Sequence, residues 1–205
     1  MVAFAQSDPG WGIEYSDETW FVWVPPQGIM NPEAGSGWAP SGHPPRNRSA
    51  REKGKVTTSA YLGLDIKENR IGWRYSSHTN RWETIEYLKE RLAAHASRGR
   101  RRLLLIWDSA SWHKARDVRD WIRAHNKKAR AEGCGVILSP ILTPVHAFWL
   151  NPVEAVIGHT KTEALPCRQF SAIEDQMASI DRYWLQRNLR RACVPTVETL
   201  IRHLH

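Results

Sequence analysis

The sequence feature that most constrains the fold is the apolar run LLLIW at Leu103–Trp107. Charged residues precede this run, and Asp108 follows it directly. A short, continuously apolar segment is typical of a central strand that is buried on both faces of a sheet. Because such a sheet needs helices on both sides, the run predicts an α/β domain with Asp108 at the end of its central strand.

Other segments predict the elements around that strand. The polar break Ser16–Glu18 interrupts β-branched and aromatic residues at 13–24, which predicts two short strands joined by a tight turn, with Asp17 at a strand end. Prolines 140, 144 and 152 are expected to exclude regular structure from most of 139–152. Further strands are expected at 56–66, 70–75 and 135–138, and helices at 79–97, 114–131, from 152 onward and at 171–188. The expected N-caps of three of these helices are Thr79, Asn151 and Ser171. Ser171 is also expected to form a capping box with Glu174. This order predicts a mixed sheet flanked by helices.

The length of 205 residues suits one folded domain. We expect a lead-in at 1–12, the domain itself at 13–190 and a C-terminal tail at 191–205. Within the domain, residues 25–55 are rich in proline, glycine and basic residues and are predicted to form a long basic loop.

The composition favours a polyanionic partner. Lysine and arginine number 29 against 21 acidic residues, which gives a net charge of +8. Nucleic acid is the leading candidate, although many soluble domains are basic for reasons of solubility. The three cysteines are odd in number and widely spaced, which fits a reducing cytosol better than a disulfide framework. No apolar run is long enough for a membrane span, so we expect no membrane partner.

Three acidic residues lie at the edges of predicted elements: Asp17, Asp108 and Glu154, the last in the first turn of a helix. Two divalent cations held by carboxylates can bind both the attacking and the leaving oxygen of a phosphoryl transfer. Ligands in open α/β sheets collect at strand ends, where these carboxylates would meet. Each acid taken alone is explained as well by a turn or by a helix start.

The motifs around the three acids resemble those of the DDE superfamily of transposases. LLLIWDSASWHKARDVRDWI at 103–122 resembles the second-aspartate motif, WLNPVE at 149–154 the third-acid motif, and YSDET at 15–19 the first. The order of the three motifs is more specific than any single one. The sequence is most similar to bacterial insertion-sequence transposases related to the mariner group, including GWAPSGHPP at 37–45 and Lys161 seven residues after Glu154.

This resemblance implies a ribonuclease H-like fold, with Asp17, Asp108 and Glu154 as catalytic residues that hold two Mg²⁺ or Mn²⁺ ions. It further implies DNA cleavage and strand transfer, double-stranded DNA as partner, a homodimer on DNA, and a bacterial, cytoplasmic and nucleoid-associated location. Supporting roles are expected for Glu18, His113 and Asn151, although His113 is equally explained as a capping or surface histidine. Candidate DNA contacts are Lys161, Arg46, Arg48, Lys114 and Trp149, together with the basic runs 98–102, 127–130 and 187–191.

Two features depart from the family pattern. The 46 residues from Asp108 to Glu154 exceed the spacing common in the mariner group, and we interpret the excess at 124–135 as a tolerated insertion. Such transposases normally carry helix-turn-helix modules ahead of the first aspartate, whereas about a dozen residues precede the first predicted strand here, and the sequence leaves open whether another chain or reading frame supplies a module of this kind. Two alternatives stay open: a ribonuclease H-like nuclease that hydrolyses without joining, and a truncated or inactive remnant that binds DNA without cutting it.

Overall fold

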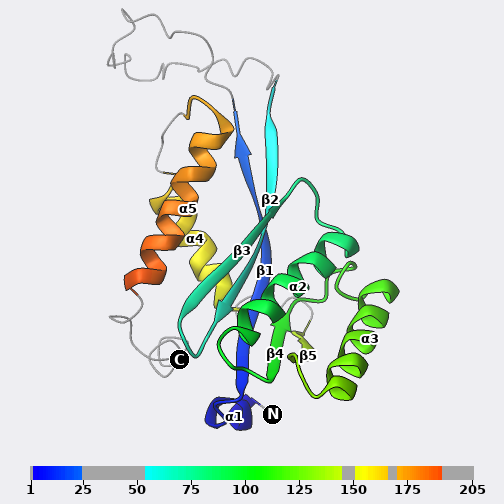
Figure 1. Ribbon diagram of the computed structural model, residues 1–205. Helices are drawn as coiled ribbons and strands as arrows, with labels where there is room; N and C mark the ends of the chain where they lie inside the picture. The colour runs from blue at the N-terminus through cyan, green and yellow to red at the C-terminus, as the bar shows by residue number, and fades with distance from the viewer. Residues whose placement is uncertain (1, 25–53, 145–150, 166–169, 191–205) are drawn as a thin grey trace, which may run out of the picture.

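A five-stranded mixed sheet forms the centre of the protein (Figure 1). The computed structural model describes residues 2–24, 54–144, 151–165 and 170–190. Strand β1 pairs antiparallel with β2 and parallel with β4, and the strand order is β3-β2-β1-β4-β5. The strands are β1 (Trp11–Trp23), β2 (Val56–Asp65), β3 (Arg70–Ser76), β4 (Arg102–Trp107) and β5 (Ile137–Leu142). The mixed sheet that the sequence predicts is therefore confirmed.

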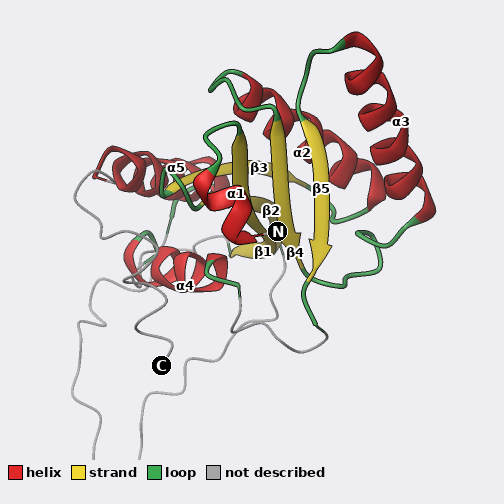
Figure 2. Ribbon diagram, turned by 90° about the horizontal axis from the view of Figure 1, so that it is seen from below, coloured by secondary structure: helices red, strands yellow, loops and turns green. Residues whose placement is uncertain are grey.

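Helices cover both faces of the sheet (Figures 1 and 2). One face packs against α1 (Val2–Ser7), α4 (Val153–Glu163) and α5 (Ile173–Arg190), and the other against α2 (Arg81–Ala96) and α3 (Arg116–Glu132). The central strand β4 is buried on both sides, because Leu104 and Ile106 face the first group of helices while Leu103, Leu105 and Trp107 face the second. Among the described helices, none combines the length and apolar content needed to cross a membrane.

Strand β1 corrects the prediction of two short strands with a turn at 16–18. It is one continuous strand, and Asp17 pairs with Leu62 of β2 within the ladder. The Ser16 hydroxyl donates a hydrogen bond to the Leu62 carbonyl, at 3.0 Å. Backbone pairing with β2 thus outweighs the low strand propensity of the polar residues. Asp17 consequently lies inside a strand and not at its end.

Three further predictions are wrong in detail. Pro140 lies within β5, which is an edge strand, where a missing N–H on the open side is tolerated. Asn80, not Thr79, caps α2, because its Oδ1 accepts hydrogen bonds from two first-turn amides. At the start of α5, Asp175 accepts a hydrogen bond from the Ala172 amide in place of the predicted capping box. Most of the basic loop, residues 25–53, and the tail 191–205 lie outside the described residues.

A buried ion cluster joins β1 to α2. The carboxylate of Glu14, which is fully buried, accepts hydrogen bonds from Arg91 at 2.8 and 2.7 Å and lies 2.9 Å from His95 Nε2. Gly72 leaves the space for the guanidinium, because a Cβ at that position would overlap Arg91. Burial raises the pKa of Glu14, but the charge of Arg91 and the hydrogen bonds from His95 and Arg91 together outweigh burial, and the pKa falls to about 2. Glu14 is therefore a structural carboxylate.

Candidate metal centre

Asp17 and Asp108 come from neighbouring parallel strands. In the β1–β4 register, Tyr15 pairs with Ile106, and continuing this register by two residues sets Asp17 beside Asp108. Strand β4 ends at Trp107, whereas β1 runs on to Trp23. The end of β4 therefore creates an open edge at which two carboxylates meet, as parallel strand ends do in α/β sheets. The Asp108 side chain is 54% exposed and accessible there.

The start of α4 is tied to the same point of β1 by Asn151. The Asn151 side chain donates hydrogen bonds to the Ser16 carbonyl, at 3.1 Å, and to Asp17 Oδ2, at 2.9 Å. Its Oδ1 also accepts a hydrogen bond from the Val153 amide at 3.2 Å, although the N-cap of α4 is Pro152 and not, as predicted, Asn151. Asn151 is buried, whereas Glu154, in the first turn, is exposed. This arrangement fixes the position of Glu154 relative to Asp17.

The pKa of Asp17 responds to the charges of the other two predicted acids. Burial and, next, the charge of Glu154 raise the pKa of Asp17 from 3.8 to about 7, and the charges of Glu18 and Asp108 add to this effect. Like charges raise a carboxyl pKa only at short range. Asp17, Asp108 and Glu154 therefore lie near the same edge of the sheet, although their ligand atoms are not among those that the described residues bring within 4.8 Å of one another.

His113 links Asp108 to Glu18. Its Nδ1 lies 2.8 Å from Asp108 Oδ1, and its Nε2 lies 2.9 Å from Glu18 Oε1. The imidazole stacks on the Trp107 indole, with ring centroids 4.2 Å apart. Burial alone would lower the pKa of His113, but the hydrogen bonds to Asp108 and Glu18 raise it to about 9. The hydrogen bond from His113 in turn lowers the pKa of Asp108.

Among the described residues, Glu18, Asp108 and His113 form the one group of acidic and histidine side chains whose ligand atoms all lie within 4.8 Å of one another, so they are a possible cation site. In the metal-free protein, the raised pKa of His113, about 9, keeps the imidazole protonated at neutral pH, so a cation would have to displace this proton to bind the ring nitrogen. Carboxylate oxygens are also the ligands that Mg²⁺ and Mn²⁺ prefer. The metal-ligand role of Asp17, Asp108 and Glu154 and the supporting roles of Glu18 and His113 stay predictions.

The predicted DNA contacts are only partly described. Lys114 is exposed next to His113, and its charge contributes to the lowered pKa of Asp108. Lys161 is exposed on α4, two turns beyond Glu154. Arg46, Arg48 and Trp149 lie outside the described residues. The stacking of Trp107 on His113 was missed, because an apolar run predicts core packing for its last residue.

Comparison with known proteins identifies the family. Residues 22–176 match the family model of the DDE superfamily endonucleases. The chain belongs to this family. The match includes Asp108 and Glu154 but begins after Asp17, so the assignment of Asp17 depends on the geometry described above. No curated protein sequence matches the chain significantly.

Solved structures give the same fold. A Mos1 transposase paired-end complex with the left transposon end shares 18% identity at a TM-score of 0.58, covering 87% of this chain and 50% of that one. The catalytic domain of Mos1 mariner transposase shares 16% identity at a TM-score of 0.50, covering 87% and 76%. A Mos1 paired-end complex with Mg shares 17% identity at a TM-score of 0.57, covering 88% and 52%. The likeness establishes the ribonuclease H-like fold, and this chain spans about half the length of the transposase chains in the complexes.

Proposed function

We propose that this DDE endonuclease-family chain is the catalytic core of a DNA transposase, which cleaves DNA strands and joins them to a target. The observation that carries the proposal is the β1–β4 register that sets Asp17 beside Asp108 at the open edge where β4 ends, with Glu154 close enough for its charge to raise the pKa of Asp17. Mos1 complexes with a transposon end, with Mg and with Mn support DNA as partner and a divalent metal as cofactor. The complete transposition activity and a homodimer on DNA are part of the proposal.

Two Mg²⁺ or Mn²⁺ ions, when bound, would polarise the scissile phosphate and stabilise the attacking and leaving oxygens. Asp17, Asp108 and Glu154 would hold these ions. Asn151 fixes the orientation of the Asp17 carboxylate through its amide hydrogen bond, at 2.9 Å. Protonated His113 holds Asp108 through Nδ1 while Glu18 holds the other side of the ring. Hydrogen-bonded partners of this kind orient metal ligands in many sites.

The positive charge of the chain supports DNA as the substrate. A net charge of +8 attracts the phosphate backbone and raises the rate of association. Lys114 is exposed and close enough to Asp108 for its charge to lower the pKa of that carboxylate, which supports a contact between Lys114 and a DNA phosphate. A bacterial, cytoplasmic and nucleoid-associated location is part of the same proposal.

The test is cleavage and joining of labelled plasmid DNA by the purified chain with Mg²⁺ or Mn²⁺. Asp108→Asn should abolish both reactions, and the matched control Asp120→Asn, which alters an exposed carboxylate on α3, should retain them. Cleavage without joined products would favour a hydrolytic nuclease of the same fold. DNA binding without cleavage under either metal would favour an inactive remnant, and cleavage unchanged in Asp108→Asn would refute the site.

A further inference from the structure

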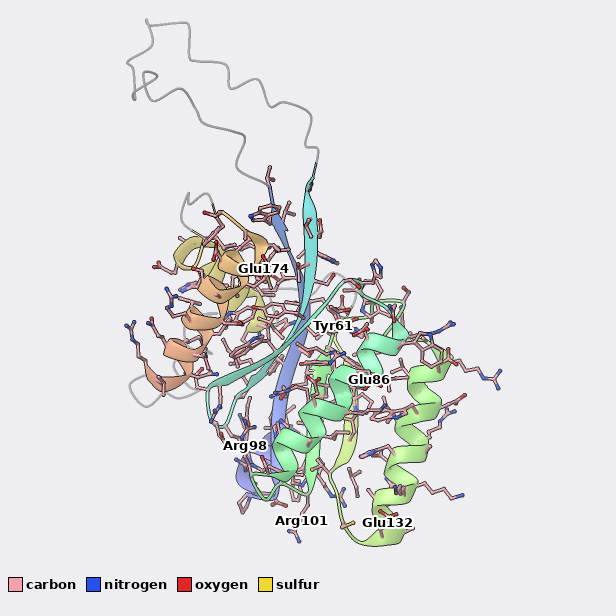
Figure 3. All side chains as sticks on the ribbon, turned by 45° about the horizontal axis from the view of Figure 1, so that its top comes forward. Tyr61, Glu86, Arg98, Arg101, Glu132 and Glu174 are labelled. Carbon is pink, nitrogen blue, oxygen red and sulfur yellow. The ribbon has the colours of Figure 1, made fainter. Side chains whose placement is uncertain are left out.

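A basic cavity lies at the end of the sheet opposite the carboxylates. It has a volume of about 680 Å³ and is formed where β1, β4 and β5 begin and α3 ends. Arg102 of its lining and Asp108 are separated by the length of β4, about 20 Å at the rise of a strand. Figure 3 shows Arg101 and Glu132, the last residue of α3, at this same end of the molecule. The lining includes Phe4, Asp8, Trp11, Arg101, Arg102 and Arg130.

The fold brings two separate basic runs of the sequence together around this cavity. Arg101 and Arg102 come from the run 98–102, and Arg130 comes from 127–130 at the end of α3. The backbone of the first two is fixed, because the Arg101 and Arg102 amides both donate hydrogen bonds to the Gly10 carbonyl, at 2.8 and 3.1 Å. The Arg102 guanidinium also lies over the Trp11 ring, 5.3 Å from its centroid.

The three cavity arginines differ from their neighbours in charge compensation. Arg98 and Arg100 form ion pairs with Asp65 and Glu68. Within the described part of the chain, no carboxylate forms an ion pair with the three arginines of the cavity. Asp8 is the one acid in the lining, and its Oδ1 already accepts a hydrogen bond from the Gly10 amide at 2.7 Å. The cavity therefore carries an excess of positive charge that its own residues leave uncompensated.

From this geometry we propose that the cavity binds the phosphate backbone of a second DNA segment, remote from the scissile phosphate. Guanidinium groups match the geometry of phosphate oxygens through paired hydrogen bonds. All three arginines are exposed at the surface, as residues that contact a DNA backbone are, whereas small-molecule sites enclose their ligand. The exposed Phe4, at 60% of its full area, adds an apolar contact for a sugar at the rim. The proposal assumes the DNA partner of the proposed function but not its chemistry.

The test measures binding of a fluorescent 40-base-pair duplex in EDTA over a range of KCl concentrations. Arg101→Gln combined with Arg130→Gln should reduce the slope of log affinity against log salt by about 2, since each lost phosphate contact contributes about 0.9. The affinity near 0.1 M salt should fall by roughly tenfold or more. Arg101→Lys with Arg130→Lys should restore most of the slope because the charge returns. Arg102 is left unchanged because it packs on Trp11.

The matched control removes the same two charges elsewhere. Lys89→Gln with Arg123→Gln alters exposed residues of α2 and α3 that do not line the cavity, and it should leave the slope near the wild-type value. An equal loss in both double variants, or no loss in either, would overturn the proposal. A further outcome would also overturn the proposal: the cavity binds pyrophosphate, and the cavity variant keeps the DNA affinity of the wild type. The cavity would then be a site for a small anion.

Failure of this proposal is distinguishable from failure of the proposed function. Asp108→Asn leaves the cavity intact, so it should keep the salt slope of the wild type while losing cleavage. The cavity variant, Arg101→Gln with Arg130→Gln, should cleave a short duplex at the wild-type rate in Mn²⁺. Such a duplex is long enough to reach the carboxylates but not the cavity as well. Loss of short-duplex cleavage in the cavity variant would contradict a binding role that is separate from the chemistry.

Discussion

Asp17→Asn should stabilise the metal-free fold at neutral pH. Burial and the neighbouring Glu154 raise the pKa of Asp17 from 3.8 to about 7. Between these two pH values the folded state retains a proton that the unfolded state has released, so this group makes stability fall as the pH rises. The loss of stability caused by ionising the buried Asp17 carboxyl is complete above pH 7. Asparagine carries no charge and can still accept the hydrogen bond from Asn151 through its amide oxygen.

The size of the effect follows from the shift. Each pH unit corresponds to 1.36 kcal/mol, so a shift of about three units gives an upper value of roughly 4 kcal/mol. Asp17 retains partial contact with solvent, which screens its neighbours, and we expect a gain of about 2 to 4 kcal/mol at pH 8. At pH 4 the gain should be close to zero, because Asp17 is then largely protonated in the folded state.

The assay is urea unfolding of both proteins in EDTA at pH 4, 6 and 8, repeated at pH 8 with Mg²⁺. The wild type should gain more stability from Mg²⁺ than the variant does, because the cation favours the ionised carboxylate. Asp120→Asn, on an exposed face of α3, is the control and should differ little from the wild type at any pH. Equal unfolding midpoints of wild type and Asp17→Asn at pH 8 in EDTA would refute the reasoning.

Three further predictions concern the residues around this site and the buried cluster. Asn151→Ala should lower the free energy of unfolding, measured by thermal denaturation, by about 1–3 kcal/mol, because the buried Ser16 carbonyl loses its hydrogen-bond donor. The same variant should raise the Mn²⁺ concentration for half-maximal cleavage by roughly 10–100-fold. His113→Ala should raise the same Mn²⁺ requirement by a similar factor without a change in DNA affinity, and unaltered metal dependence would count against its positioning role. Glu14→Gln should lower the free energy of unfolding in urea at pH 7 by about 3–5 kcal/mol, because Arg91 stays buried without the carboxylate that pairs with it. Since the pKa of Glu14 is held near 2, that difference should shrink as the pH falls from 4.5 toward 2, and a constant difference would contradict the assignment.

The central strand was predictable because its signal is local. Five consecutive apolar residues at Leu103–Trp107 specify a buried strand, and the position of Asp108 follows from where the run stops. The start of α4 was also predictable, because Asn151 and Pro152 are favoured at helix starts. The resemblance of these two segments to DDE motifs is consistent with the family match.

The errors fall where long-range contacts decide the structure. The polar residues 16–18 predict a turn, but pairing with β2 keeps β1 extended through them. Pro140 predicts a loop, and the sequence does not reveal that its strand lies at the edge of the sheet. Asn151 was expected only as a cap and a guide for Glu154, whereas its amide also reaches Asp17, which lies 134 residues away in the sequence. Local patterns carry no information about such contacts.

The proposed metal site of Asp17, Asp108 and Glu154 is tested most directly by replacing Mg²⁺ with Fe²⁺ and generating hydroxyl radicals with ascorbate and peroxide. Radicals formed at a bound ion cut the backbone nearby, and mass spectrometry locates the cuts. We predict cuts in three segments distant in sequence, around residues 17, 108 and 151–154, all suppressed by excess Mg²⁺ and lost in Asp108→Asn. Cuts missing from any one of these segments, or cuts confined to another part of the chain, would contradict the account.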